Sequence, residues 1–163
     1  MTGVPSPDRH VIGLVADTHG QLRAGVHAAF AGVEMILHAG DVGGQEVLDE
    51  LKMIAPVKAV QGNVDPDDDP MLPPAVTLEI GGLMIHLSHG NELGTPTPAK
   101  LMEVYAADII VYGHTHRSLV MRSGSRLVVN PGSAGPRRFD LHPSVGVLTI
   151  VEGEAEVEII DIA

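Results

Sequence analysis

The sequence has no cysteine and very few aromatic residues. Without cysteine the chain can form neither a disulfide framework nor a thiolate site, so any bound metal must be held by oxygen and nitrogen atoms. Aromatic residues make up 2% of the 163 residues and hydrophobic residues 44%. The core must therefore be built from Val, Ile, Leu, Ala and Met, which favours an α/β protein.

Positive charge is also scarce. Ten Lys and Arg residues stand against 21 Asp and Glu, which gives a formal net charge of −11, and no basic run is longer than Arg137-Arg138. We therefore expect no broad binding of nucleic acid. Any phosphate chemistry must rely on local positive charge, such as a bound metal ion.

Long hydrophobic runs are missing as well. No apolar stretch approaches the roughly 18 residues that a membrane span needs, and residues 1–9 lack the apolar segment of a signal peptide. We expect a soluble cytoplasmic protein without membrane contact. Its length predicts one compact domain over residues 10–163, preceded by a flexible tail at residues 1–9.

Apolar runs of strand length alternate with helix-like segments in the first half of the chain. This pattern is typical of parallel strands joined by crossovers. The expected order is strand 11–16, helix 21–30, strand 35–39, helix 45–53 and strand 57–60. A loop rich in Pro and Asp follows at residues 62–74.

The second half of the chain indicates further sheet. Gly81-Gly82 between two apolar runs predicts a β-hairpin of strands 75–80 and 83–88. Thr97 and Pro98 predict the N-cap and first residue of a helix that extends to about Ala106. The other strands are expected at 109–112, 119–122, 126–130, 145–151 and 155–162, the last four antiparallel. The prediction is an α/β fold of two mixed β-sheets packed face to face, with helices outside.

Five of the expected strands are followed by potential metal ligands. Because ligands of open α/β sheets bind outside the carboxyl ends of the strands, these side chains can meet at one edge if the strands are parallel. The seven residues are Asp17, His19, Asp41, Asn63, His89, His114 and His116. Imidazole, carboxylate and amide ligands suit Mn, Fe, Zn, Ni or Co.

The spacing of these ligands has a physical reason. On an extended strand end, side chains two residues apart point to the same side, so both members of Asp17-x-His19 or His114-x-His116 can reach one cluster. Asp41 follows Gly40 at a tight turn and is the natural bridging anion between two ions. A single strand-ending Asp is more often a turn former or helix cap, so the interpretation depends on the whole set.

The ordered motifs closely resemble those of the calcineurin-like metallophosphoesterase family, in particular its small single-domain bacterial and archaeal phosphodiesterases. The resemblance covers about residues 10–135. The motifs are Asp17-x-His19, Gly40-Asp41, Gly62-Asn63, His89-Gly90 and Gly113-His114-Thr115-His116. The resemblance implies a four-layer α/β sandwich and hydrolysis of phosphate esters by a solvent hydroxide held between two metal ions.

The resemblance also implies a role for each ligand. The first metal would be bound by Asp17, His19 and His116, and the second by Asn63, His89 and His114, with Asp41 bridging. Asp41, Asn63 and His89 are the candidate catalytic residues. The expected cofactor is a pair of divalent transition-metal ions, manganese first, with iron, zinc, nickel or cobalt as alternatives. Relatives often form dimers or tetramers, so a homodimer or homotetramer is a possible state.

Two positions depart from the family pattern. Many members carry a histidine directly after the metal-binding asparagine, where it is thought to protonate the leaving oxygen, but this chain has Val64. Because valine cannot transfer a proton, we expect good activity on small phosphodiesters with acidic leaving groups and poor activity on alkyl monoesters. The second departure is Asn91, where relatives often have another histidine.

Several other polar residues have weaker interpretations. Arg137 and Arg138 in the last loop could contact a substrate phosphate, or be solvated turn cations. His38 could hydrogen-bond a metal ligand from outside the metal shell. The acidic run is expected to be a solvated loop, and the remaining histidines to have no role in the site. These residues are Asp65, Asp67, Asp68 and Asp69, and His10, His27, His86 and His142.

Two alternatives to a phosphodiesterase stay open. A retromer scaffold subunit shares the family's fold and uses it mainly to bind partners, so the chain could be a non-catalytic interaction module. It could also be a phosphomonoesterase, including one acting on nucleotides, although Val64 and the lack of an inserted cap domain argue against this.

Overall fold

The computed structural model describes residues 9–137 and 141–163 of the chain. The expected tail at residues 1–9 lies outside the described residues except for Arg9, which begins the first strand. The site candidate Arg138 also lies outside them.

The first sheet contains five strands in the order β10-β9-β1-β2-β3. β1 pairs parallel with β2 and β2 with β3, whereas β9 pairs antiparallel with both β1 and β10. The strands are β1 (Arg9–Val15), β2 (Met35–His38), β3 (Val57–Ala59), β9 (Ser144–Val151) and β10 (Glu154–Asp161).

The second sheet also contains five strands, in the order β4-β5-β6-β8-β7. β5 and β6, like β6 and β8, are parallel, whereas the hairpins β4–β5 and β7–β8 are antiparallel. The strands are β4 (Ala75–Ile80), β5 (Leu83–Ser88), β6 (Ile109–Val111), β7 (Leu119–Ser123) and β8 (Arg126–Asn130). Gly81 and Gly82 form the β4–β5 turn with positive φ angles of 58° and 83°, as the sequence predicts.

The helices are short. They are α1 (Gly25–Ala29), α2 (Gln45–Lys52), α3 (Pro98–Val104) and the 3-10 helix η1 (Asn91–Leu93). The hydroxyl of Thr97 accepts from the N–H of Lys100, so the predicted cap of α3 is confirmed. The helix expected at residues 21–30 is wrong in its first turn, because the N–H of Gln21 bonds to the carbonyl of Thr18 and closes a tight turn before α1.

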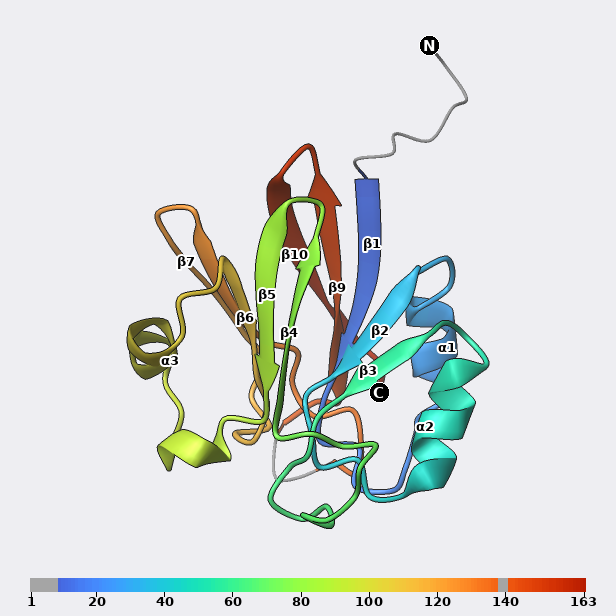
Figure 1. Ribbon diagram of the computed structural model, residues 1–163. Helices are drawn as coiled ribbons and strands as arrows, with labels where there is room; N and C mark the ends of the chain where they lie inside the picture. Colours follow the sequence, from blue (N-terminus) through green and yellow to red (C-terminus); the bar gives the residue numbers. More distant parts are fainter. Residues whose placement is uncertain (1–8, 138–140) are drawn as a thin grey trace, which may run out of the picture.

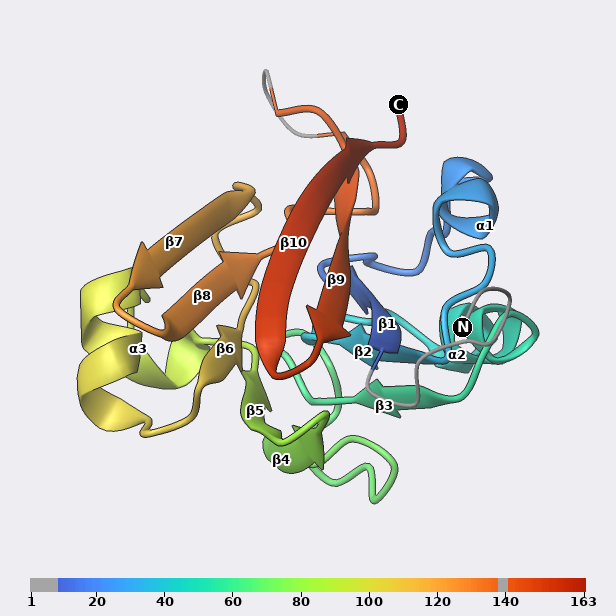
Figure 2. The same ribbon diagram turned by 90° about the horizontal axis from the view of Figure 1, so that it is seen from above.

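The elements form four layers, as predicted. Figure 2 shows α1 and α2 against the outer face of the first sheet, and α3 against the outer face of the second. One core lies between the two sheets and includes Ile12, Leu87 and Leu148. Separate cores lie beneath α1 and α2, around Phe30 and Leu51, and beneath α3, around Leu101. Because almost all of these side chains are aliphatic, the scarcity of aromatic residues in the sequence carries over into the packing.

The parallel strands of the two sheets run in the same direction. In Figure 1 the arrows of β1 and β5 both point down, toward loops that gather at the bottom of the molecule. All loops that carry candidate ligands leave carboxyl ends of such strands, so the two sheets present them at one shared end. Among the described residues, no helix is long and apolar enough to cross a membrane.

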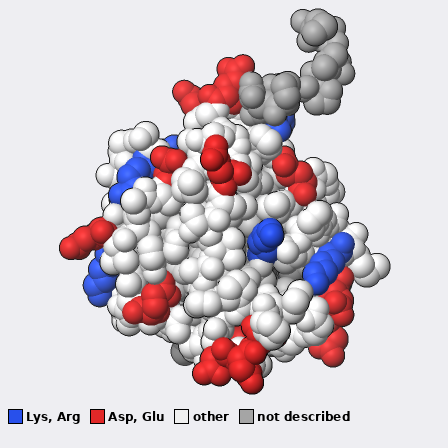
Figure 3. Space-filling model, in the orientation of Figure 1, with Lys and Arg blue, Asp and Glu red and all other residues white. Residues whose placement is uncertain are grey.

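The surface near this end is acidic. Figure 3 shows acidic side chains gathered over the loop that joins β3 and β4, while Lys and Arg stand singly on this face. On this face the acidic loop disfavours the approach of a polyanion, and the absence of broad nucleic-acid binding stays a prediction.

Candidate metal centre

All seven candidate ligands converge at the shared end of the two sheets. The first sheet contributes Asp17 and His19 after β1, Asp41 after β2 and Asn63 after β3. The second sheet contributes His89 after β5, and His114 and His116 after β6. Convergence at one edge is thus found, but the edge is shared by two sheets.

The donor atoms form two overlapping groups. Asp17, His19 and His116 offer ligand atoms within 4.8 Å of one another, and so do Asp17, Asp41 and His89. The first group is the set that the resemblance implies for the first metal. The second group shares Asp41 and His89 with the set implied for the second metal and also contains Asp17, whose Oδ1 lies 3.8 Å from His89 Nε2.

Short distances link the other ligands into a row. His116 Nε2 lies 3.3 Å from His19 Nε2, and His19 Nε2 lies 3.7 Å from Asp41 Oδ2. Asp41 Oδ2 is also 3.3 Å from His89 Nε2. This one oxygen therefore faces a histidine of each half of the row, where one half holds the ligands implied for the first metal and the other half those implied for the second. At the far end, Asn63 Oδ1 lies 2.9 Å from His89 Nε2 and 3.2 Å from His114 Nδ1. The position of Asp41 is the one that a bridging ligand needs.

The backbone at the ligands is not extended, so the expected reason for their spacing is wrong. Asp17, His19, Asp41, His114 and His116 all have positive φ angles, between 48° and 72°. Non-glycine residues rarely adopt this left-handed conformation, and it concentrates at functional sites. Within the convergent set His114 and His116 therefore have different neighbours, since His116 Nε2 lies beside His19 Nε2 and His114 Nδ1 beside Asn63 Oδ1, whereas Asp17 and His19 belong to one donor group.

Backbone hydrogen bonds hold the first two ligand loops together beyond the end of the strands. The N–H of Asp17 donates to Gly40 O at 3.0 Å, and that of His19 to Asp41 O at 3.0 Å. The N–H of Gly20 then donates to Val42 O at 2.8 Å. This ladder continues the parallel pairing of β1 with β2 and offsets the cost of the left-handed residues.

Each buried carboxylate is oriented by a backbone N–H. Asp17 Oδ2 accepts from the N–H of His114 at 3.1 Å, and Asp41 Oδ1 accepts from the N–H of Val64 at 2.9 Å. The other oxygen of each residue is therefore directed at the histidines. Burial opposes ionisation of Asp41, but hydrogen bonds from His89 and Val64 lower its pKa, so it is charged at neutral pH.

His89 is fully buried and has one ring nitrogen committed to the backbone. Its Nδ1 donates to Ala39 O at 2.8 Å, which directs Nε2 at Asp41 and Asn63. Burial alone would lower the pKa of His89, but the carboxylates of Asp41 and Asp17 raise it. Burial and the neighbouring His89 lower the pKa of His114, against the opposing charges of Asp41 and Glu92.

His38 supports the loops and does not bond a candidate ligand side chain. Thr18 Oγ1 donates to Val42 O at 2.7 Å, so it accepts from His38 Nε2, at 2.9 Å. His38 Nδ1 accepts from the N–H of Gly40 at 3.1 Å. The expected bond to a ligand is thus wrong, because both ring nitrogens are used. Burial lowers the pKa of His38 to about 4, so the ring is neutral.

Asp65 corrects the expectation of a solvated acidic loop. It is 8% exposed, and its carboxylate accepts from the N–H groups of Val42, Gly43 and Gly62 at 2.9 to 3.1 Å. It therefore ties the Asp41 loop to the Asn63 loop. Sequence reasoning missed this residue, and the only signal was its position two residues after Asn63.

Asn130 was also missed and positions the last ligand loop. It is fully buried at the end of β8, and its amide donates to Gly113 O at 3.1 Å and to Thr115 Oγ1 at 3.0 Å. Its Oδ1 accepts from the N–H of Gly132. The Asn-Pro-Gly sequence after an apolar run was the available signal, since it marks a turn whose amide can bond the backbone.

Gly62 allows the loops to approach closely. A Cβ atom at this position would overlap Asp41 Oδ1 and the Asp41 backbone nitrogen. Only glycine therefore lets Asn63 stand next to Asp41, which explains the Gly-Asn pair in the sequence.

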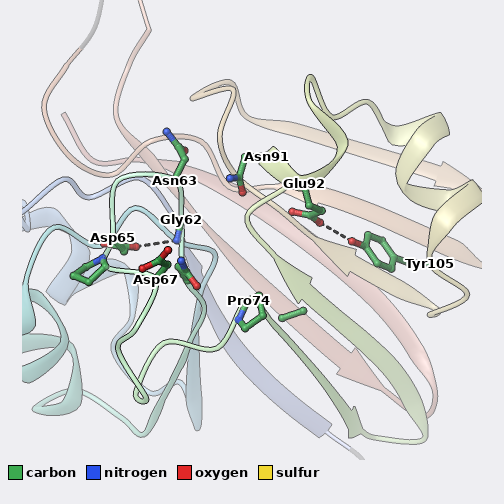
Figure 4. A pocket seen from close by; sticks show the side chains of 11 residues that line it. Gly62, Asn63, Asp65, Asp67, Pro74, Asn91, Glu92 and Tyr105 are labelled. Atoms are coloured by element: carbon green, nitrogen blue, oxygen red, sulfur yellow. Dashed lines mark hydrogen bonds between the residues drawn. The ribbon is translucent and has the colours of Figure 1, made fainter.

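A cavity of about 600 Å³ opens beside Asn63, between the loop after β3 and the segment that follows β5 (Figure 4). Its lining includes Asn91, Glu92 and Tyr105. A smaller cavity of about 360 Å³ opens beside His116 and is lined by Ser118, His142 and Ser144 among others. One cavity therefore lies beside Asn63, at one end of the ligand row, and the other beside His116, at the opposite end.

Arg137 is exposed, and its contact with a substrate phosphate stays a prediction. Val64 is 55% exposed and takes part in the site through its N–H alone.

The donor set fits divalent transition metals. All candidate ligand atoms are carboxylate or amide oxygens and imidazole nitrogens, which suit such ions at borderline hardness. The two carboxylates and His89 are buried, whereas His19, His114 and His116 are half-buried and Asn63 is exposed. The buried ligands can therefore bind cations from the interior of the protein, while the less buried ligands leave the site accessible from the cavities.

Comparison with known proteins agrees with this geometry. Residues 11–153 match the calcineurin-like phosphoesterase superfamily domain. A probable metallophosphoesterase of Methanothermobacter thermautotrophicus is 35% identical over 159 residues, covering 92% of this chain and 91% of the relative. A phosphodiesterase of Methanocaldococcus jannaschii is 26% identical over 155 residues, covering 84% and 91%.

Solved structures show the same fold. The structure of vacuolar protein sorting 29 from Cryptosporidium parvum is similar with a TM-score of 0.79 and 26% identity, over 95% of this chain and 98% of that one. Family match, sequence identity over nearly the whole chain and shared architecture lead to one conclusion. The chain belongs to the calcineurin-like phosphoesterase superfamily.

Proposed function

We propose that the protein hydrolyses small phosphodiesters with the help of two divalent metal ions held by the seven converging side chains. The observation that carries this proposal is the pair of overlapping donor groups, with Asp41 Oδ2 placed between His19 and His89. When bound, a pair of divalent ions supplies Lewis-acid activation of water and neutralisation of the phosphoryl oxygens.

Each of the seven residues would have a defined place in holding the two ions. Asp17, His19 and His116 would hold one ion, and Asn63, His89 and His114 the other. Asp41 would contact both, since its Oδ2 faces both halves. Because backbone N–H groups fix Asp17 and Asp41, these carboxylates need no rearrangement when they bind.

A diester is the substrate class that fits the surroundings best. A phosphodiester has two substituents, and a cavity adjoins each half of the ligand row, one beside Asn63 and one beside His116. Val64 offers no proton to a leaving group, which favours esters with acidic leaving groups. The phosphodiesterase name of the Methanocaldococcus relative supports the same choice.

The test is a metal-scanned hydrolysis assay on a panel of phosphate esters, including a bis-aryl phosphate and serine phosphate. We expect turnover of the bis-aryl diester with manganese, and lower or no turnover with magnesium or calcium, which prefer oxygen ligands. Asp41→Ala should lower kcat/KM by at least about 10³-fold, because the side chain that faces both halves is removed.

Two results would contradict the proposal. One is an inert protein that takes up no transition metal under any loading condition, which would favour a non-catalytic interaction module. The likeness to the vacuolar sorting protein is the observation that supports this second candidate. The other is equal turnover of serine phosphate and the bis-aryl diester, which would indicate a phosphomonoesterase.

A further inference from the structure

The cavity beside Asn63 contains a carboxylate that is held in place. Glu92 Oε1 accepts from the N–H of Gly90 at 3.0 Å, and Glu92 Oε2 accepts from the hydroxyl of Tyr105 at 2.6 Å (Figure 4). The Tyr105 ring is itself braced by the ring of His86, which stacks on it at a centroid distance of 3.7 Å. Glu92 is thus a fixed part of the cavity wall.

Glu92 is charged and near the metal centre. Although partial burial opposes ionisation, hydrogen bonds from Tyr105 and the backbone lower the pKa of Glu92. It stands three residues after His89, and its charge acts on His114. A substituent that extends from a phosphorus atom at the candidate metal centre into this cavity would therefore meet its charge.

The cavity as a whole carries uncompensated negative charge. Its described lining holds the carboxylates of Asp65, Asp67 and Glu92 and no Lys or Arg. The carboxylate of Asp65 accepts hydrogen bonds from three backbone N–H groups. The carboxylates of Glu92 and Asp67 are therefore the ones that can attract a ligand bound in the cavity. The remaining lining is formed by amide side chains, prolines, a glycine, an alanine and Tyr105, so no cationic side chain of the lining offsets this charge.

A fixed carboxylate in such a wall favours one kind of substituent. Hydrogen bonds from Tyr105, Ser88 and backbone N–H groups orient its two oxygens, so what the carboxylate offers a ligand is a fixed negative charge. An ammonium group would gain charge-assisted hydrogen bonds there. A second phosphate or a carboxylate would be repelled, and at roughly 6 Å one such interaction changes affinity by about tenfold in partly screened surroundings.

We propose that Glu92 is a specificity-determining residue, and that the cavity beside Asn63 selects phosphodiesters whose second substituent carries a positively charged amine. The inference rests on the proposed function, because the metal centre places the phosphoryl group at the mouth of the cavity.

The test uses three phosphonates with tails of similar length and different charge. They are 2-aminoethylphosphonate, propylphosphonate and 3-phosphonopropionate, whose tails end in an ammonium, a methyl and a carboxylate group. Their Kd values are measured by calorimetry on the manganese-loaded protein. We expect the tightest binding for the amine and the weakest for the carboxylate, with a ratio of about 10² between these two.

Variants identify the residue responsible. Glu92→Gln keeps the size and the acceptor oxygen and should reduce the amine-to-carboxylate ratio by about tenfold. Tyr105→Phe keeps the ring but removes the hydroxyl that holds Glu92, and should reduce the ratio by a smaller factor. Glu103→Gln removes an exposed carboxylate of α3 that does not line the cavity, and should leave the ratio unchanged.

The outcomes separate the two proposals. Three results would overturn the role of Glu92. The first two are equal binding of the three phosphonates and failure of all three to bind. The third is an unchanged amine-to-carboxylate ratio in a Glu92→Gln variant whose melting temperature equals that of the wild type. Hydrolysis of a bis-aryl diester by the same preparations is measured in parallel. Phosphonate selectivity without hydrolysis would overturn the proposed function alone, and hydrolysis without selectivity would overturn this inference alone.

Discussion

The side chain of Val64 is 55% exposed, while its N–H donates to Asp41 Oδ1. The position therefore serves the metal centre through the backbone, which any residue except proline can supply. Its side chain is free to vary without loss of that hydrogen bond. This separation explains how the chain keeps the ligand geometry although it lacks the histidine that many members of the family carry there.

Val64→His should restore a proton donor for poor leaving groups. We expect kcat/KM for a dialkyl phosphodiester, which must expel an alkoxide, to rise by about 10² or more, since general acid catalysis contributes about 10² to 10⁴. The bis-aryl diester should change little, because its phenolate leaves without a proton. A substrate series of graded leaving-group pKa measures both effects. Parallel changes for all leaving groups would contradict the prediction.

His38 predicts a pH dependence of stability. Its pKa is lowered to about 4 in the folded protein, against 6.5 for the free side chain. Above about pH 6.5 the ring is neutral in both states. As the pH falls toward 4, the unfolded chain binds a proton that the folded chain does not, so the free energy of unfolding decreases, by up to about 3 kcal/mol.

The experiment compares wild type with His38→Gln by urea unfolding between pH 7 and pH 4.5, with chelator present throughout. The wild type should lose more stability than the variant over this range, and the difference isolates His38 because the other titrating groups are common to both. Identical pH dependence of the two proteins would show that His38 is not held neutral.

At the scale of elements, the loops after the strands carry the site, and their mutual bonds decide its shape. The β1 and β2 loops are joined by backbone hydrogen bonds, the β2 and β3 loops by Asp65, and the β6 loop is held by Asn130. Because each loop is fixed by another, five non-glycine residues can be kept at positive φ.

Asp65→Ala should loosen two of these loops. The change leaves the N–H groups of Val42, Gly43 and Gly62 without their acceptor, which costs about 3 kcal/mol or more of unfolding free energy. It should also weaken metal binding, because Asp41 and Asn63 lie on these loops. Unfolding in urea and a metal titration measure the two effects.

Asp68→Ala is the matched control for this prediction. Asp68 lies in the same acidic loop and is exposed, so its replacement should change stability by less than about 0.5 kcal/mol. Equal effects of the two substitutions would mean that Asp65 is no more than a solvated loop residue.

The elements themselves could be predicted from local sequence. The alternation of apolar runs, the Gly81-Gly82 turn and the Thr97-Pro98 cap act within a few residues, and each appears where expected. The first turn of the expected helix at 21–30 could not be predicted in this way. There the loop of Asp17 and His19 closes through Gln21 and Thr18, and that turn competes with the helix.

At the scale of the whole molecule, the candidate metal centre lies between the two sheets. Asp17, Asp41 and Asn63 come from the first sheet, and His89 and His116 from the second. Ions held between them would add a link across the interface at the end of the sandwich. A ligand that binds only the folded protein raises its stability by mass action.

Metal removal should therefore lower the melting temperature. With manganese at about 10³ times its Kd, the free energy of unfolding rises by about 4 kcal/mol, which corresponds to roughly 10 °C for a chain of this size. Scanning calorimetry with manganese and with EDTA measures the shift. The melting temperature of Asp41→Ala should differ little between manganese and EDTA. A shift as large as that of the wild type would mean that the stabilising ion binds elsewhere.

The sequence by itself determined the kinds of ligand and the ends of the strands that carry them. Both are local properties, set by apolar periodicity and by the residues that follow each run. It also excluded sulfur ligands, since the chain has no cysteine.

Only the tertiary structure decided which ligands face one another. His19 and His116 are 97 positions apart and meet because two separate sheets end at the same place. The family resemblance implies that His116 and His114 serve different ions, but their spacing in the sequence does not. The burial of Asp65 and the two amide hydrogen bonds of Asn130 depend on contacts between loops of different strands. No local pattern records such contacts, because the backbone conformation that permits them is imposed by the partner loop.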